Sequence, residues 1–119
     1  MHVILADDQA NVRSALRLLV EQDGASRVVA EAADAAGLLL ALERHPADLV
    51  LLDWELPGLP ARYLVRLIQM ERPYTRILAL SSRPEARQPA LDAGVTAFVS
   101  KGAAPDVVRA ALRGVGRAV

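Results

Sequence analysis

Four apolar stretches of the sequence are each followed by polar side chains that could bind a cation or an anion. These side chains are Asp7 and Asp8, Asp53, Ser81 and Lys101. If the stretches are parallel strands of one sheet, their carboxyl ends share the edge at which ligands bind in open α/β sheets. Three carboxylates, one hydroxyl and one ammonium would then surround a single crevice.

This set of groups predicts a particular chemistry. Crowded carboxylates repel one another and tend to hold protons, a problem that a divalent cation removes. Oxygen ligands without His or Cys favour a hard cation such as Mg²⁺. The cation and Lys101 would hold an anion from two sides, with a hydrogen bond from Ser81, as in phosphoryl transfer. Asp53 is the best placed nucleophile, because carboxylates can form aspartyl-phosphates.

The strands that must position these groups are short apolar runs. They are predicted over residues 3–6, 28–32, 48–53, 76–80 and 96–100. The run that ends at Asp53 has four consecutive apolar residues, which suits a strand covered on both faces in a parallel sheet. Glu31 interrupts the second run, so we expect that strand at an edge.

Helices are predicted between the strands from apolar residues at helical spacing. They cover residues 10–21, the segment from Asp34 to about 45, residues 60–71, a short segment from about 88, and a last segment from 105. Asp34 is the predicted cap of the second helix, Pro89 is expected in the first turn of the fourth, and Gly94 ends it. Val107 and Val108 are expected to face inward. This alternation predicts an α/β fold with a parallel sheet covered on both faces.

The composition excludes several function classes. The 119 residues suffice for one domain, and 53% of them are apolar. Basic and acidic residues are equal in number, so the chain lacks the excess of positive charge typical of nucleic-acid binding. It has no cysteine, no signal-peptide pattern, and no apolar run near the roughly 20 residues of a membrane helix. We therefore expect one cytoplasmic domain over residues 1–119 that binds neither nucleic acid nor a membrane.

Over its whole length the sequence resembles the receiver domain of bacterial two-component response regulators. The matching features are the acid pair at 7–8, Asp53 followed four residues later by Pro57, Ser81, the stretch 94–98 and Lys101. The resemblance implies a flavodoxin-like, doubly wound fold, with five parallel strands in the order 2-1-3-4-5 and five helices. It implies a phosphoacceptor in signal transduction rather than an enzyme.

The resemblance also assigns roles to the acidic residues. Asp53 would accept the phosphoryl group from a phosphohistidine of a sensor histidine kinase. Asp8 and Asp53 would ligate Mg²⁺ directly, together with the backbone carbonyl of Glu55. Asp7 would act on the ion through a water molecule.

The remaining site residues would bind the phosphoryl group and report its presence. By the same resemblance, Ser81 and Lys101 would bind the phosphoryl oxygens. Phe98 matches the aromatic switch position, whose ring turns inward when Ser81 moves toward the phosphate. By the same resemblance, phosphorylation would alter the face formed by the fourth helix, the fifth strand and the fifth helix.

The closing segment, residues 98–115, is most similar to receivers that precede a LuxR-type helix-turn-helix domain. This similarity implies transcription regulation through an attached or separate DNA-binding output. It also implies a homodimer in which the first and fifth helices pair.

Three features depart from the family pattern. Ala61 stands where glycine is usual, Gly102 follows Lys101 where proline is usual, and the segment 81–101 is slightly short. The short fourth helix favours an alternative, a degenerate receiver that serves as a phosphorylation-independent interaction module. A metal-dependent phosphatase with an aspartyl intermediate is a third interpretation.

Two charged residues flank the predicted crevice. Glu55 and Arg83 each lie two residues past a site residue. We hypothesise that they pair across the mouth and limit the access of the water that hydrolyses the aspartyl-phosphate. Trp54 is expected to be half-exposed beside the site.

Overall fold

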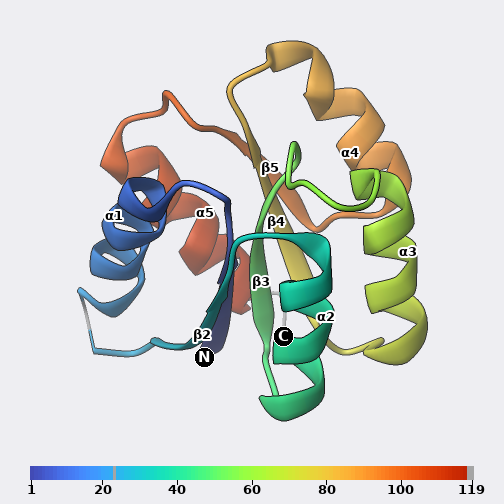
Figure 1. The fold of residues 1–119 in the computed structure, drawn as a ribbon. Helices are drawn as coiled ribbons and strands as arrows, with labels where there is room; N and C mark the ends of the chain where they lie inside the picture. Colours follow the sequence, from blue (N-terminus) through green and yellow to red (C-terminus); the bar gives the residue numbers. More distant parts are fainter. Residues whose placement is uncertain (23, 118–119) are drawn as a thin grey trace.

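The computed structural model describes residues 1–22 and 24–117, with five parallel strands flanked by helices (Figure 1). The strands are β1 (His2–Ala6), β2 (Arg27–Ala32), β3 (Leu49–Asp53), β4 (Arg76–Ser81) and β5 (Ala97–Ser100). The helices are α1 (Ala10–Glu21), α2 (Ala35–Arg44), α3 (Ala61–Glu71), the 3₁₀ turn η1 (Pro84–Ala86), α4 (Arg87–Ala93) and α5 (Pro105–Arg117). The strand order β2-β1-β3-β4-β5 confirms the predicted topology, with β2 at an edge. No helix in this part of the chain is both long and apolar enough to cross a membrane.

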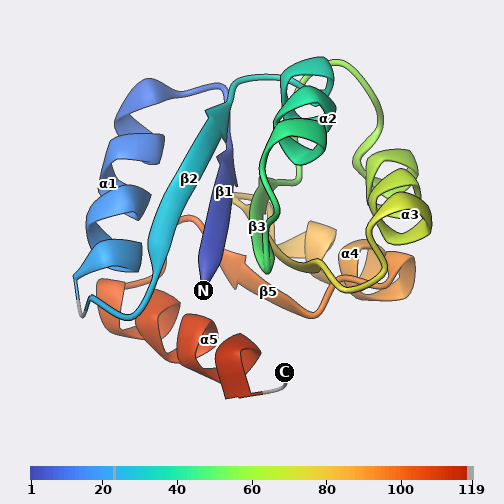
Figure 2. The same cartoon turned by 90° about the horizontal axis from the view of Figure 1, so that it is seen from below.

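The two faces of the sheet carry separate hydrophobic clusters, because successive strand residues point to opposite faces. Val3 and Leu5 of β1 belong to the cluster with α1 and α5. Ile4 and Ala6 belong to the cluster with α2, α3 and α4. Figure 1 shows this division of the helices, and Figure 2 shows it from below. β3 is buried along its whole length between the clusters, as its unbroken apolar run predicts.

The helix boundaries follow the local signals in the sequence. Asp34 caps α2, since its carboxylate accepts a hydrogen bond of 2.7 Å from the N–H of Gly37. The fourth helix is short, as predicted, with 7 residues and Pro89 in its first turn. It ends at Gly94, whose φ of +104° lies in the left-handed region that favours glycine. A Cβ atom there would also lie 2.5 Å from Nε2 of Gln69.

One prediction about the last helix is wrong. Val107 is 52% exposed, whereas Val108, Leu112 and Val115 are buried against the sheet. Adjacent helical residues point about 100° apart around the axis. Val107 and Val108 therefore do not both face the sheet.

The loop between β3 and α3 is held against α2. The carbonyl of Pro57 accepts a hydrogen bond of 2.9 Å from the N–H of Ala35. Gly58 has a φ of +117°, and a Cβ atom on it would lie 2.9 Å from the Cβ of Ala35. α3 then begins at Ala61, which is buried, so an alanine is accommodated in its first turn. These contacts fix the backbone that follows Asp53.

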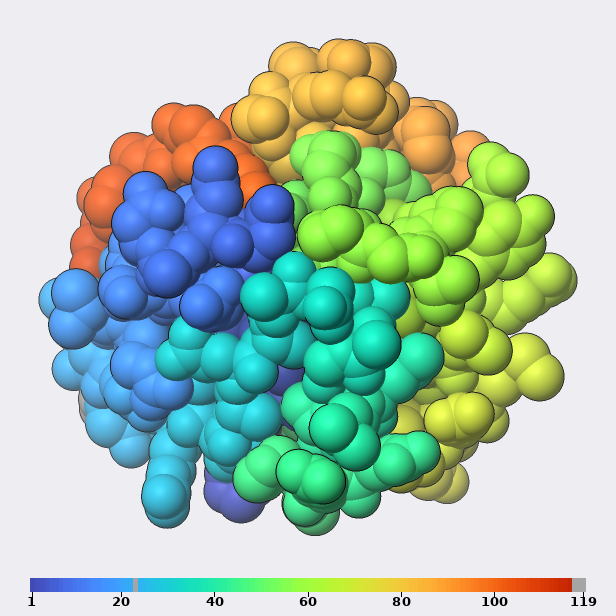
Figure 3. All heavy atoms as spheres, viewed as in Figure 1, coloured from blue at the N-terminus to red at the C-terminus, as the bar shows by residue number. Residues whose placement is uncertain are grey.

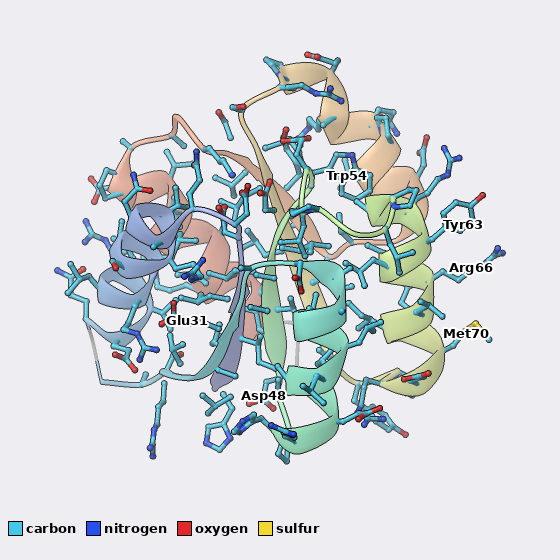
Figure 4. The ribbon with its side chains drawn as sticks, viewed as in Figure 1. Glu31, Asp48, Trp54, Tyr63, Arg66 and Met70 are labelled. Atoms are coloured by element: carbon cyan, nitrogen blue, oxygen red, sulfur yellow. The ribbon has the colours of Figure 1, made fainter. Side chains whose placement is uncertain are left out.

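Glu31 connects the edge strand β2 to α1 (Figure 4). Its carboxylate lies 2.9 Å from Nε of Arg13 and 2.6 Å from Nη2 of Arg17. The hydrogen bond from Arg17, helped by Arg13, holds the pKa of Glu31 below its usual range despite partial burial.

Replacing Glu31 with Gln is expected to lower the free energy of unfolding by about 1 kcal/mol near neutral pH, because two guanidinium groups lose their shared carboxylate. A lowered pKa means that this stability is present above the ordinary pKa of glutamate and is lost as pH falls through the folded-state value. The difference in the free energy of unfolding between wild type and variant, measured with urea, should therefore become smaller as the pH is lowered. The control is Glu71→Gln, on the exposed side of α3. A loss that is independent of pH would contradict the electrostatic explanation.

Candidate functional site

The residues predicted to do chemistry lie at one edge of the sheet, where the strands end. Asp7 directly follows β1, Asp53 ends β3, Ser81 ends β4 and Lys101 directly follows β5. In the space-filling view, the segments that follow these strands gather over the upper part of the molecule (Figure 3). The parallel topology brings these residues to one place, as predicted.

Three carboxylates form the centre of the site. Asp7, Asp8 and Asp53 each offer an oxygen atom, and these atoms lie within 4.8 Å of one another. Asp7 and Asp53 are only 1% and 2% exposed, whereas Asp8 is open to solvent. Backbone N–H groups orient the two buried carboxylates: Gln9 donates to Asp7 at 2.9 Å, and Glu55 donates to Asp53 at 3.0 Å.

Lys101, the only lysine in the sequence, lies between the two buried acids. Its Nζ atom is 2.8 Å from Oδ2 of Asp7 and 3.2 Å from Oδ1 of Asp53. Its backbone N–H donates to the carbonyl of Ser81 at 2.9 Å, which fixes the lysine beside the end of β4. Burial lowers the pKa of Lys101, but the close ion pair with Asp7 and the charge of Asp53 outweigh it. The net pKa is therefore raised.

Asp53 is not fully stabilised as an anion by its surroundings. Burial raises the pKa of its carboxyl group, and the charge of Asp7 raises it further. The backbone N–H of Glu55 and the ammonium of Lys101 lower it only in part. A cation at the acid cluster would favour the ionised, nucleophilic form of Asp53.

The donor set fits a hard divalent cation. Lys101 Nζ lies 2.8 Å from the buried Oδ2 atom of Asp7, yet no donor among the described residues reaches that oxygen at a normal hydrogen-bond angle. The short distance establishes an ion pair, and the angle leaves a lone pair of Oδ2 available to another ligand. A crevice lined by Asp8, Asp53 and Glu55, among others, opens the cluster to solvent. Oxygen ligands without His or Cys suit a hard divalent cation such as Mg²⁺.

The Ser81 hydroxyl is hydrogen-bonded to Glu55, and among the described residues it makes no hydrogen bond with the three aspartates. It donates to the Glu55 carboxylate, at 2.8 Å from Oε1 and 3.0 Å from Oε2. It accepts a hydrogen bond of 3.0 Å from the N–H of Arg83. The Nε atom of Arg83 lies 3.8 Å from Oε2 of Glu55, so the predicted pairing of these two residues is confirmed.

Two aromatic residues lie close in the sequence to site residues, since Trp54 follows Asp53 and Phe98 precedes Lys101 by three residues. Phe98 is opposite Ala79 of β4 and packs, partly buried, against the cluster with α2, α3 and α4. Its switch role remains a prediction. Trp54 is half-buried, as expected (Figure 4), and its backbone N–H donates to the carbonyl of Leu80 at 2.7 Å. As the only tryptophan, it can report on the site by fluorescence.

Two contacts of the site were not predicted. One is the hydrogen bond between Ser81 and the Glu55 side chain, for which the sequence predicted a pairing with Arg83 instead. The other is a hydrogen bond of 2.7 Å from Nη1 of Arg13 to the carbonyl of Asp7. The position of Arg13 in the first turn of the helix after the acid pair is the signal that could have indicated it.

Comparisons with known proteins agree with this geometry. A model of the response regulator receiver domain family matches residues 3–113. The Fimbriae Z protein of Salmonella typhimurium is 38% identical over 101 residues, which cover 83% of this chain and 48% of that protein. The chain spans about half the length of the curated relatives it matches, at 48% and 54% for two of them.

Solved structures share the fold at comparable identity. The isolated REC domain of RcsB from Salmonella enterica serovar Typhimurium, solved in the presence of phosphomimetic BeF₃⁻, has a TM-score of 0.90 and 28% identity. The match covers 98% of this chain and 88% of that one. A two-component response regulator of the LuxR family from Aurantimonas sp. has a TM-score of 0.86 and 30% identity, over 97% of this chain and 84% of that one.

Proposed function

Because this chain belongs to the response regulator receiver domain family and is of the LuxR type, we propose that Asp53 accepts a phosphoryl group from a sensor histidine kinase in an Mg²⁺-dependent reaction. The observation that best supports this is the meeting of Asp8, Asp53 and Lys101 in one crevice, from three different strand ends. We take residues 1–119 as the receiver unit.

In the proposed transfer, an Asp53 oxygen attacks the phosphorus of a phosphohistidine. The new P–O bond forms as the P–N bond breaks, and the imidazole leaves with that electron pair and takes up a proton. Lys101 would then contact the phosphoryl oxygens, which it can reach from its place 3.2 Å from Asp53. Ser81 would turn so that its hydroxyl donates a hydrogen bond to another of these oxygens. Positioning and charge neutralisation supply most of the catalysis in such transfers.

The acid cluster would hold the cation. Asp8 and Asp53 would ligate Mg²⁺ together with the backbone carbonyl of Glu55, and Asp7 would act through a water molecule. When bound, the ion would neutralise charge on the phosphoryl oxygens. The available lone pair of the buried Asp7 carboxylate and the solvent-open position of Asp8 support this assignment.

We further infer that the domain works in the cytoplasm and regulates transcription through a DNA-binding output, attached or separate, without contacting nucleic acid itself. Phosphorylation would alter the face formed by α4, β5 and α5, with Phe98 as its aromatic switch. A homodimer through α1 and α5 would cover a largely apolar hollow between these helices. The hollow is lined by Val12, Ala15, Leu19, Ala103, Pro105 and neighbouring residues.

One observation favours a second function. α4 has only 7 residues and follows a 3₁₀ turn, so the element proposed to carry the output is short. A receiver of this kind could act as an interaction module that does not depend on phosphorylation. In that case the acid cluster would bind a cation without forming an adduct.

Incubation with Mg²⁺ and acetyl phosphate, followed by intact mass measurement and a phosphate-release assay, separates these functions. The proposed switch should show one phosphoryl group per chain that is removed by hydroxylamine, as expected for an acyl phosphate. Steady release of phosphate over many turnovers would instead indicate a phosphatase. Absence of an adduct would favour the interaction module.

Replacing Arg83 with Ala is expected to shorten the lifetime of the phosphorylated protein by about two- to fivefold. Glu55 lines the crevice and pairs with Arg83, and this pair would limit the access of water to the aspartyl-phosphate. An exposed pair contributes at most about 1 kcal/mol, which bounds the effect. Decay of the adduct is followed by intact mass, with Arg87→Ala on α4 as the matched control. Equal decay rates in the three proteins would rule out this role.

A further inference from the structure

We propose that the Glu55 side chain is a positioning residue that holds the domain in its resting state by occupying the Ser81 hydroxyl. The phosphoryl group on Asp53 would have to displace Glu55 before Ser81 could bind it. This proposal rests on the function proposed above and adds a control element to the same site.

The contacts of Ser81 carry the argument. A serine hydroxyl has one proton to donate. That proton is directed at the Glu55 carboxylate, with the two carboxylate oxygens at 2.8 and 3.0 Å. The hydroxyl oxygen is held from its other side by the N–H of Arg83 at 3.0 Å. Ser81 is only 1% exposed, so water competes poorly for this hydrogen bond. The hydroxyl therefore cannot reach a phosphoryl oxygen while it donates to Glu55.

The position of Glu55 explains how phosphorylation would release the hydroxyl. Glu55 follows Asp53 by two residues, and its N–H donates to the Asp53 carboxylate at 3.0 Å. A phosphoryl group brings nearly two negative charges to this place. Lys101 contacts Asp7 and Asp53 instead of Glu55, so it does not shield the Glu55 carboxylate from that charge. Repulsion would move the carboxylate away from Ser81.

Arg83 offers the displaced carboxylate a second position. Its Nε atom lies 3.8 Å from Glu55 and 3.6 Å from Glu85, and its side chain is more than half exposed. A small movement outward would exchange the Ser81 contact for a closer pair with Arg83. The negative charge of the phosphoryl group would thus weaken the Ser81–Glu55 hydrogen bond, and the ion pair between Glu55 and Arg83 would take its place.

Beryllofluoride binding in the presence of saturating Mg²⁺ tests the proposal, with Trp54 fluorescence as the readout. Removal of the resting contact in Glu55→Ala should tighten beryllofluoride binding by about tenfold, since a hydrogen bond to a charged group no longer has to be broken. Glu85→Gln, which alters another carboxylate beside Arg83, should remain within twofold of wild type. Unchanged or weaker binding by Glu55→Ala would overturn the proposal. If the Glu55 carboxylate served only to attract the cation, Glu55→Ala would bind beryllofluoride more weakly than wild type, which is the opposite of the expected result.

A double-mutant cycle with Ser81 separates the contact from a general effect of charge. In the Ser81→Ala background, Glu55→Ala should no longer tighten beryllofluoride binding. An equal gain in beryllofluoride affinity in both backgrounds would overturn the proposal.

Phe98 is the only phenylalanine in the sequence. A single fluorinated phenylalanine should therefore show the activated signal at lower beryllofluoride concentration in Glu55→Ala.

The ligand-free protein provides a test that does not depend on phosphorylation. The same two substitutions should couple by about fivefold in the unfolding equilibrium constant, because they remove one shared hydrogen bond. If the effects of the two substitutions on the free energy of unfolding were additive, the hydrogen bond between Glu55 and Ser81 would be ruled out. A wild type that binds no beryllofluoride would contradict the proposed function, while the unfolding cycle would still decide whether Glu55 holds Ser81.

Discussion

Replacing Asp53 with Asn should reduce phosphorylation by acetyl phosphate below detection in intact mass measurement. The amide is a far weaker nucleophile than the carboxylate and cannot form an acyl phosphate. No other carboxylate has the same environment, because Asp8 is exposed and Asp7 is paired with Lys101 at 2.8 Å. The control is Asp48→Asn, at the opposite end of β3, which should be phosphorylated like wild type. An adduct of equal yield on Asp53→Asn would place the phosphoacceptor elsewhere.

The same substitution should not unfold the protein. Burial, with the charge of Asp7, raises the pKa of Asp53 in the folded state. A raised pKa means that the carboxyl group contributes most to stability below its ordinary pKa, and that this contribution is lost as pH rises through the folded-state value. At neutral pH without Mg²⁺, the ionised Asp53 is therefore a cost that Asn removes. Urea unfolding of Asp53→Asn should give a free energy equal to wild type or up to about 1 kcal/mol higher.

Replacing Lys101 with Met should affect both stability and chemistry. The ammonium faces two buried carboxylates at 2.8 and 3.2 Å, and its loss leaves them to repel each other without a cation. Breaking a buried ion pair in this way costs about 3 kcal/mol or more. Loss of a group that contacts the phosphoryl oxygens should slow phosphorylation by about a hundredfold.

Mg²⁺ distinguishes the cause of the instability of Lys101→Met. An added cation at the acid cluster stabilises the folded state by mass action and should restore much of the lost free energy in urea unfolding. Acidification should also reduce the difference in the free energy of unfolding from wild type, because Asp53, whose pKa is raised by burial, becomes protonated. The double substitution Asp7→Asn with Lys101→Met should be more stable than Lys101→Met alone. If neither Mg²⁺ nor acid reduces the loss of unfolding free energy in Lys101→Met, Lys101 stabilises the protein through packing instead.

Much of the fold could be predicted from periodicity and turn residues alone. The unbroken apolar run before Asp53 predicted the buried central strand, and Pro89 and Gly94 predicted the short fourth helix. The convergence of the acids with Lys101 followed from parallel topology, because all strand ends share one edge. Signals that depend on backbone pattern were therefore sufficient for the placement of the site.

Contacts between side chains of different loops could not be predicted in the same way. The sequence places Glu55 and Ser81 on neighbouring strand ends, but the bond between them depends on loop conformation and rotamers. Val107 illustrates a smaller ambiguity. Of two adjacent valines in a helix, the sequence does not decide which one faces the core. In the structure Val108 joins Leu112 in the core, and about half of the Val107 surface remains exposed.

A crystal structure of this protein with Mg²⁺ and beryllofluoride tests the central claim most directly. The account predicts one beryllofluoride group on Asp53, contacted by Lys101 and by a Ser81 hydroxyl that has left Glu55. It predicts one Mg²⁺ held by Asp8, Asp53 and the backbone carbonyl of Glu55. A cation bound elsewhere, or a beryllofluoride group on another residue, would contradict it.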